Sequence, residues 1–514
     1  MGPRIAPISR RRADVSRRSI AVVALVVLAL AGCTSAPPQP DTTNGTSRFY
    51  DQVVHWKTCS TVLQCATAIV PLDWAHPSGP TISIAMAKQR AISGKPQGTI
   101  LFDPGGPGAS GVDFVEAYGG QMMDPSVRDA YDVVGFDPRG IGHSTPIRCY
   151  SSAKLEHYYY DVLPGRIGSD QWLAADLKAQ DALAKACAKN TGPLLAHVDT
   201  SSAARDMDAL RAVFGEKKLD YFGGSYGTDL GLEYARLFPQ KVGRFLLDSV
   251  ESPDASGEQL DVGQAKGFET ELQQYLAACV PDQSTCPFSG SVADADAQLT
   301  SLFATLNAHP IADADGRYLN SANLAIAITS ALYSPQLWSD LSSALKAVKT
   351  GSAGPAFDLA DQYLERSDSG QYPNLIEAYY AVGCLDRASP DTVTAMRSEA
   401  ADIAKVAPVL GRYLGYSNAV CGVWPYPPAA TPPPVTAAGS DPILLVNATN
   451  DPATPYAQAQ EVASHLANGH LVTRVGDGHG SYEQGYPCID DIVDRYFLTG
   501  AVPASDPMCP SSGT

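Results

Sequence analysis

The sequence is poor in positive charge for its length. Its 514 residues include 37 lysines and arginines against 54 aspartates and glutamates, which gives a formal net charge of −17 at pH 7. Proteins that bind nucleic acid need clustered basic residues to neutralise the phosphates. We therefore expect no nucleic-acid partner for this chain.

Metal-binding motifs and internal repeats are also missing. The 11 cysteines contain no C-x-x-C pair, and none of the 9 histidines stands at the spacing of a metal ligand. Structural and catalytic zinc sites are built from such spacings. We expect no metal and no cofactor.

The amino-terminal apolar run is too short for a comfortable membrane span. "IAVVALVVLALAG" covers residues 20–32, whereas a transmembrane helix needs about 20 apolar residues. The run follows a segment with six arginines and one aspartate, which is the layout of a signal peptide. It ends at Cys33 in "LAGC", which resembles a bacterial lipobox, where cleavage precedes a lipidated cysteine.

We predict that residues 1–32 are a lipoprotein signal peptide and that Cys33 is lipidated. Residues 33–47 are rich in Pro, Thr and Ser and are expected to form a polar tether. The membrane would then be a partner through Cys33, and the exported protein would lie in the cell envelope, on the outer face of the membrane, with secretion as a further fate. An uncleaved membrane anchor and a plain secretory signal are the alternatives.

Ten cysteines remain when Cys33 is set aside. An even number of cysteines in a chain with an export signal indicates disulfides rather than reactive thiols. Spacing alone does not fix the connectivity. Pairing cysteines that are consecutive along the chain suggests five bridges: Cys59–Cys65, Cys149–Cys187, Cys279–Cys286, Cys384–Cys421 and Cys488–Cys509.

The mature chain is too long for one ordinary core domain. Within residues 48–255, short β-branched runs alternate with helical stretches, which favours an α/β fold with a mostly parallel sheet. Residues 256–415 show helical patterns without that alternation, and the alternation resumes within 416–514. We expect an α/β core made from the first and last of these segments, with the middle one inserted as a helical cap after the sixth strand.

The stretch "GGSYG", 223–227, places glycines around Ser225 between a strand-like run and a helix-like run. In a nucleophile elbow, the serine sits on a strained strand-to-helix turn, and only glycine lets the neighbouring backbones pass. A G-x-S-x-G match also arises by chance in a flexible turn. Other motifs must therefore decide between a nucleophile elbow and a flexible turn.

A catalytic serine needs a histidine to take its proton and a carboxylate to orient that histidine. In α/β hydrolases the acid and then the histidine follow the serine along the chain. Ligands of such sheets bind at the carboxyl ends of the strands. Asp451 lies just past the strand-like "PILLVNATN", and His479 comes soon after "HLVTRV". We predict Ser225, Asp451 and His479 as the catalytic residues.

Two backbone N–H groups should bind the oxyanion of the tetrahedral intermediate. One is the N–H of Tyr226, which follows the nucleophile. The other should come from "DPGGPGASG", 103–111, which follows an upstream strand-like run. We choose Gly106, because Pro107 has no N–H, and keep Gly105 in reserve.

The segment "DPRGIGHST", 137–145, also follows a strand-like run. Its Asp137 and Arg139 can close a turn through charge-assisted hydrogen bonds. We interpret both residues as structural rather than catalytic.

Five motifs in this order, "DPGGPGASG", "GFDPRGIGHS", "GGSYGT", "NDPATP" and "GHGSY", resemble the exported tripeptidyl aminopeptidases of actinobacteria. These are α/β-hydrolase serine peptidases of the prolyl-aminopeptidase-like group. The sequence is similar to the mycobacterial cell-envelope carboxylesterase or protease A and its paralogues, over about residues 45–510. The resemblance implies the α/β-hydrolase fold with a helical cap and a peptide or protein substrate. It assigns the nucleophile, acid and base to Ser225, Asp451 and His479.

Two departures from the family pattern leave the substrate open. Pro104 stands where related prolyl aminopeptidases have a histidine, and "DSVESPD", 248–254, replaces a "DG-V-DP" pattern near the catalytic edge. An aminopeptidase also needs a carboxylate to hold the ammonium group of its substrate, and any single acid is more often an ordinary solvated or capping group. The candidates are Glu251, Asp254, Glu377 and Asp386.

The favoured function is an exported serine peptidase that releases short, tripeptide-type units from free amino termini. A carboxylesterase, a lipase or an endopeptidase can use the same triad. A solute-binding lipoprotein without catalysis is the alternative from another class. The intact order of Ser225, Asp451 and His479 argues against that alternative.

Overall fold

The computed structural model describes residues 45–511. The predicted signal peptide, Cys33 and most of the predicted tether lie outside these residues. Among the described residues, none of the helices combines the length and the apolar character that crossing a membrane requires.

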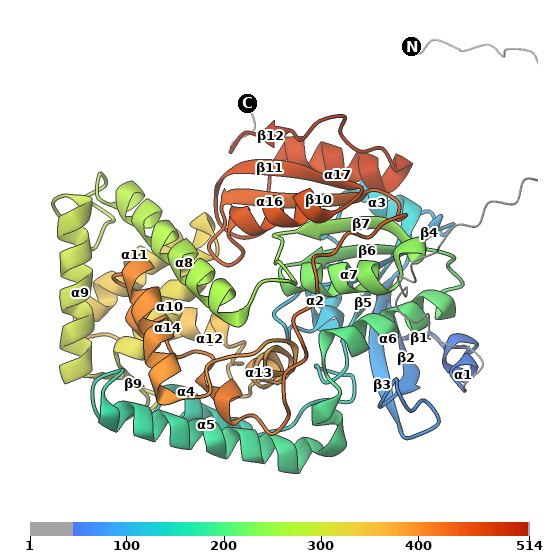
Figure 1. Ribbon diagram of the computed structural model, residues 1–514. Helices are drawn as coiled ribbons and strands as arrows, with labels where there is room; N and C mark the ends of the chain where they lie inside the picture. The colour runs from blue at the N-terminus through green and yellow to red at the C-terminus, as the bar shows by residue number, and fades with distance from the viewer. Residues whose placement is uncertain (1–44, 512–514) are drawn as a thin grey trace, which may run out of the picture. The chain divides into compact units, whose positions relative to one another are not determined.

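A ten-stranded sheet runs through the core (Figure 1), in the order β1-β2-β3-β5-β4-β6-β7-β10-β11-β12. The pairs from β1 to β5 are antiparallel, and those from β5 to β12 are parallel. The mostly parallel sheet predicted from the sequence is confirmed. The strands are β1 (Lys57–Thr58), β2 (Leu63–Pro71), β3 (Thr81–Gln89), β4 (Gly98–Asp103), β5 (Tyr131–Phe136), β6 (Leu219–Gly224), β7 (Val242–Asp248), β10 (Ile443–Asn450), β11 (Gly469–Asp477) and β12 (Met508–Cys509).

Two hydrophobic layers cover the faces of the sheet. One contains residues of α6, α7 and α16, such as Leu230 and Val462, and the other contains residues of α2, α3 and α17, such as Val115 and Val493. Because both faces are covered, strands such as β10 are buried along most of their length. The core helices are α1 (Ser47–Tyr50), α2 (Gly111–Tyr118), α3 (Pro125–Ala130), α6 (Thr200–Val213), α7 (Tyr226–Leu237), α16 (Tyr456–His465) and α17 (Pro487–Thr499).

A helical segment follows β7 and has its own hydrophobic core, which includes Leu272, Phe303 and Leu345 (Figure 1). We call it the cap. It is mostly helical, as expected, with an additional small hairpin of two strands. Its elements are α8 (Gly257–Cys279), α9 (Val292–Ala308), β8 (Ile311–Ala312), β9 (Tyr318–Leu319), α10 (Ser321–Leu332), α11 (Trp338–Lys349), α12 (Gly354–Tyr363), α13 (Leu375–Asp386), α14 (Val393–Val406) and α15 (Gly411–Leu414).

The position of the cap in the strand order differs from the prediction by one. The structure inserts it after the seventh strand, because the two-residue edge strand β1 precedes the strands that the sequence pattern shows. A strand of two residues is too short to produce a detectable alternation.

Two helices that precede β6 also contact the cap, namely α4 (Ser152–Tyr160) and α5 (Asp170–Thr191). Tyr160 belongs to the hydrophobic core of the cap, and its hydroxyl donates to Asp361 of α12 at 2.6 Å. The sequence analysis assigned these helices to the core, because an amphipathic helix has the same pattern whichever partner it packs against. The helical layer therefore draws on two separate stretches of chain.

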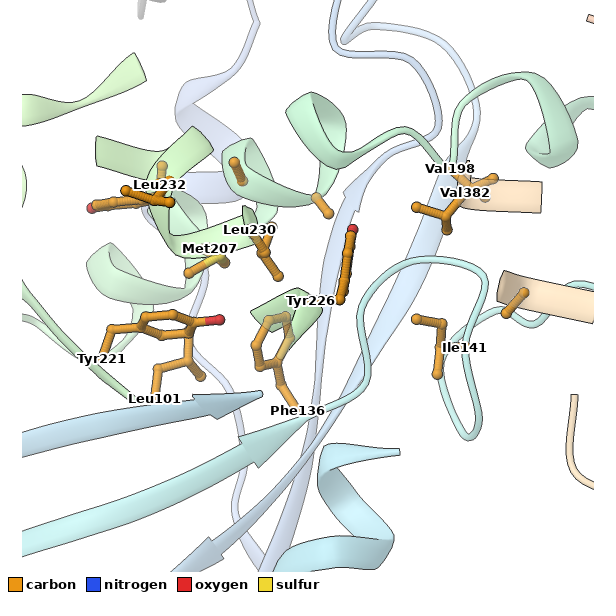
Figure 2. Close-up of a cluster of buried hydrophobic side chains, with 14 of the residues drawn as sticks. Leu101, Phe136, Ile141, Val198, Met207, Tyr221, Tyr226, Leu230, Leu232 and Val382 are labelled. Atoms are coloured by element: carbon orange, nitrogen blue, oxygen red, sulfur yellow. The ribbon is translucent and has the colours of Figure 1, made fainter. Parts of the chain in front are cut away.

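The hydrophobic layer beside the Ser225 turn joins the core to the cap. Figure 2 shows Tyr226 and Leu230 of α7 near Phe136 at the end of β5, with Val382 of α13 in the same cluster. All four side chains are buried. The first turn of α7 is therefore packed between sheet and cap.

The ten cysteines of the described residues form the five bridges suggested by chain proximity. Cys149–Cys187 ties α5 to the segment after β5, and Cys384–Cys421 ties α13 to the loop that follows the cap helices. The other bridges are Cys59–Cys65, Cys279–Cys286 and Cys488–Cys509. Each bridge limits the freedom of the unfolded chain.

Candidate active site

Ser225 lies on the sharp turn between β6 and α7. Its φ is 54° and its ψ is −127°, a combination that a residue with a side chain adopts only when its surroundings hold it there. A Cβ on Gly223 would lie 2.3 Å from the carbonyl oxygen of Gly227, and one on Gly227 would lie 2.6 Å from that of Asp103. The turn has the geometry of a nucleophile elbow.

Asp451 and His479 meet at the carboxyl edge of the sheet, from the loops after β10 and β11. Nδ1 of His479 lies 2.8 and 3.0 Å from the two carboxylate oxygens of Asp451. The buried carboxylate also accepts from the N–H groups of Ala453 and Thr454. Since the carboxylate takes the Nδ1–H, Nε2 carries the lone pair of the neutral ring. Ser225 and His479 line the same cavity.

The pKa of His479 reflects this pairing. Burial alone would lower the pKa of the imidazole, but the charge and the hydrogen bond of Asp451 outweigh burial and raise it above the usual 6.5. Asp248 also raises it. A histidine with these neighbours is suited to take a proton from a hydroxyl group.

The loop that carries His479 is fastened by residues that the sequence analysis did not single out. Arg474 of β11 is buried and donates to three carbonyl oxygens of this loop. Asp248, at the end of β7, accepts from two loop N–H groups, and the hydroxyl of Ser249 accepts from a third. The lone charged residue inside the run "HLVTRV" is the signal that could have indicated Arg474.

The cap contacts the loops of both His479 and Asp451. The carbonyl oxygen of Tyr333, just after α10, accepts from the N–H of His479 at 2.8 Å. The Tyr333 ring lies edge-on to the imidazole, with 5.4 Å between centroids. From α8, Gln264 donates to the carbonyl oxygen of Ala453 at 3.1 Å. No sequence signal indicated these cap residues, because the contacts depend on tertiary packing.

The N–H groups of Tyr226 and Gly106 belong to residues that border a cavity beside Ser225. Within residues 45–511, neither N–H donates to a protein acceptor. Gly105, the reserve choice, differs because its N–H donates to the carboxylate of Asp103 at 2.8 Å. Gly106 is therefore the better placed of the two glycines to bind an oxyanion.

Two cavities meet at Ser225. The first, of about 200 Å³, lies between the elbow and the cap, and we call it the acidic cavity. Arg387 on its wall pairs with Glu251 at 3.0 Å and with Asp229 at 2.7 Å. Because Asp261 and Asp386 also lie on the wall, carboxyl groups outnumber the one guanidinium. Besides Tyr226, four tyrosines lie on the wall: Tyr333, Tyr363, Tyr379 and Tyr380.

The four candidates for an ammonium ligand have different surroundings. Glu251 and Asp386 line the acidic cavity, but Asp386 is engaged by the N–H and the hydroxyl of Thr200 at 2.9 and 2.6 Å. Burial raises the pKa of Asp386 to about 8 and also raises that of Glu251. Asp254 is off the wall of this cavity and accepts from the hydroxyl of Ser252.

The prediction for Glu377 is wrong. Its buried carboxylate accepts from the N–H groups of Cys149 and Tyr150 at 3.1 and 2.7 Å, and it does not line the acidic cavity. The cavity-facing residues of α13 follow the helical period, at 375, 376, 379, 380, 383 and 386. Glu377 lies off that face, where it fastens the segment after β5.

The second cavity, of about 480 Å³, opens on the other side of Ser225 and includes His479. We call it the aromatic cavity. Five of its rings contact one another in series, with centroids 5.0 to 5.8 Å apart: Tyr118, Phe114, Phe102, Phe222 and Tyr482.

Asp137 and Arg139 have the structural surroundings that we expected, although they do not pair with each other. Asp137 accepts from the hydroxyl of Ser110 and the N–H of His143, both at 2.7 Å. Arg139 is fully buried and pairs with Asp206 of α6 at 2.6 Å. Asp137 therefore closes the turn, and Arg139 ties it to the helical layer.

Two clusters in the described part of the chain have a spacing that could hold a metal ion. One is Asp254, Glu461 and His465, and the other is Asp124, Glu483 and Asp494. Neither includes a predicted catalytic residue. The expectation that the protein uses no metal or cofactor stays a prediction.

Comparison with known proteins gives matches over nearly the whole chain. A family model described as TAP-like protein matches residues 407–509. Serine protease Hip1 of Mycobacterium tuberculosis is 32% identical over 526 residues, which cover 97% of this chain and 99% of the relative. Carboxylesterase B of the same species is 34% identical over 87% of this chain and 86% of its own. Tripeptidyl aminopeptidase of Streptomyces lividans is 30% identical over 90% of this chain and 87% of its own.

Proposed function

Because the chain belongs to the TAP-like family of α/β hydrolases and is a serine hydrolase of that family, we propose that it is an aminopeptidase. The proposed reaction releases short, tripeptide-type units from free amino termini of peptides or proteins. The family resemblance noted in the motifs is confirmed, and the aminopeptidase activity is the finer step that we infer from the site.

In the proposed mechanism, His479 takes the proton of Ser225 as the hydroxyl attacks the scissile carbonyl carbon. Asp451 holds the imidazole in the required tautomer and stabilises the imidazolium. The N–H groups of Tyr226 and Gly106 bind the oxyanion. His479 then protonates the leaving amine, and water hydrolyses the acyl-enzyme with help from the same groups.

The acidic cavity is the observation that carries the proposal. It adjoins the two oxyanion donors, where the acyl part of a substrate would lie. Its carboxyl groups outnumber its one guanidinium group. Glu251 is our choice for the ammonium ligand. It contacts Arg387 through Oε1, which leaves its other oxygen available, whereas Asp386 is occupied by Thr200. Burial raises the pKa of Glu251 to about 7, and an ammonium group beside it would favour the carboxylate form and complete a charge-assisted hydrogen bond.

Two chromogenic tripeptide anilides test the proposal, one with a free amino terminus and one acetylated. We expect wild type to cleave only the free peptide, and Ser225→Ala to lose turnover by about 10⁶-fold while keeping its fold. Equal cleavage of both peptides would indicate an endopeptidase. Cleavage of simple esters alone would indicate a carboxylesterase, the activity named for one relative. Either outcome would contradict the aminopeptidase proposal and would leave the assignment as a serine hydrolase unchanged.

We also propose that the protein is exported and held on the outer face of the membrane by a lipid on Cys33. The support is the lipobox-like sequence before that cysteine. Metabolic labelling with palmitate should mark wild type, and Cys33→Ala should be unlabelled. A labelled Cys33→Ala protein would contradict lipidation at this residue. An unlabelled wild type that stays in the membrane with residues 1–32 attached would favour the uncleaved anchor.

A further inference from the structure

The aromatic cavity has no role in the acyl side of the proposed reaction, yet it opens directly on Ser225. Its wall is a continuous series of rings that runs from α2, through the ends of β4 and β6, to the loop after β11. Phe102, Phe222 and Tyr482 are buried, while Tyr118 at the end of α2 is 54% exposed. The cavity therefore has a rigid apolar wall and an open mouth.

The positions of the catalytic groups indicate which part of the substrate lies in which cavity. The residues with the oxyanion N–H groups, Tyr226 and Gly106, line the acidic cavity, whereas His479 lines the aromatic cavity. His479 must deliver its proton to the leaving nitrogen, so the leaving part of the substrate lies on the imidazole side of Ser225. The acyl part then extends into the acidic cavity and the leaving part into the aromatic one.

We propose that the aromatic cavity is the subsite for the residue that follows the scissile bond, and that it selects an aromatic or large apolar side chain there. The inference rests on the proposed peptidase function. Burial of an aromatic side chain against this wall should favour it over glycine by about 10- to 100-fold. Glu483 on the rim, whose pKa burial raises to about 7, disfavours an acidic side chain at the same position above that pH, where it is charged.

The reverse of acylation offers a direct measurement of this subsite. An added amine attacks the acyl carbon, the ester bond to Ser225 breaks, His479 takes the amine proton, and the proton returns to the serine oxygen. An amine that fits the aromatic cavity therefore competes with water for the acyl-enzyme. The ratio of captured to hydrolysed product reports binding on the leaving side alone, because the acyl group is constant.

The experiment forms the acyl-enzyme from a chromogenic tripeptide ester with a free amino terminus and, in parallel, from a simple acetyl ester. Phenylalanine amide, glycine amide and aspartate amide are the competing nucleophiles. We expect phenylalanine amide to capture the acyl group at about tenfold lower concentration than glycine amide, and aspartate amide to be the poorest. Equal capture by all three amides overturns the proposal.

Variants test whether the aromatic cavity causes the preference for phenylalanine amide. Tyr118→Ala and Phe114→Ala should each lower the preference for phenylalanine amide several-fold. Tyr318→Ala is the matched control, because Tyr318 in β9 of the cap has the same exposed fraction of 54% and lies off this cavity. An unchanged preference in both cavity variants places the selectivity elsewhere and overturns the assignment. If the tripeptide ester fails to react while the acetyl ester acylates, the aminopeptidase proposal fails, and the acetyl series still tests this subsite.

Discussion

The two cavities beside Ser225 share one nucleophile but have walls of different origin. Cap residues from α8 and α13, such as Asp261 and Tyr379, supply much of the acidic wall, while core residues from α2 and β6, such as Phe114 and Phe222, form the aromatic wall. The part of the chain that carries out the chemistry thus also contacts the leaving side. In the proposed reaction, recognition of the acyl side would draw on the inserted segment, which can change without altering the predicted catalytic residues.

After Ser225→Ala, the largest expected effect removes the chemistry from both sides of this comparison. Asp451→Asn should lower kcat by about 10⁴-fold, because the amide no longer holds the His479 tautomer or stabilises the imidazolium. Peptide and ester substrates should lose activity alike. Steady-state kinetics with both classes measures this. A loss limited to peptides would contradict the assignment of Asp451 as the shared acid.

A smaller effect on kcat should come from the contact between the cap and the loop that carries Asp451, which we call the acid loop. A Cβ on Gly267 of α8 would stand 2.4 Å from the carbonyl oxygen of Pro452, next to Asp451. Gly267→Ala should therefore shift the acid and lower kcat by about 100-fold.

Gly263→Ala, one turn earlier on α8, is the matched control, because the nearest neighbour of its new Cβ would be Pro455 Cγ, at an ordinary contact distance of 3.9 Å. Both substitutions raise helix propensity by about 1 kcal/mol, so thermal unfolding separates stability from positioning. Full activity in Gly267→Ala would show that the cap does not position the acid loop.

Glu251→Gln tests the acidic side alone. Loss of a charge-assisted hydrogen bond to the ammonium group should lower kcat/KM for free tripeptides by about tenfold. Hydrolysis of a neutral ester is the internal control and should change little. An equal loss on both substrates would mean that Glu251 acts through Arg387 on the fold rather than on the amino terminus.

The smallest effect concerns the pH profile. His479 must be neutral to act as a base, so kcat/KM should rise with pH through its raised pKa, above 6.5, for every substrate. The amino terminus of a free peptide loses its proton near pH 7.7–8.0. A falling limb should therefore appear only with free peptides, and a profile without that limb would contradict recognition of the ammonium group.

The strands that carry the catalytic loops could be predicted from the sequence because each is a short buried run that ends in a glycine or polar cluster. The chain order of Ser225, Asp451 and His479 then placed them at one edge of the sheet. Which acids face the substrate could not be predicted in the same way. Glu377 and Asp386 lie on one helix, but the helical period of α13 and its docking decide that only Asp386 lines the cavity.

The disulfides have a consequence for the order in which the protein is built. Each bridged cysteine lies 6 to 38 residues along the chain from its partner. By contrast, β7 pairs with β10, which follows the whole cap, so the sheet is complete only after the cap has been made. Loops of this length close readily, and domains form as the chain emerges from its amino end. The covalent bonds can therefore be made segment by segment, ahead of the last strands that create the active site.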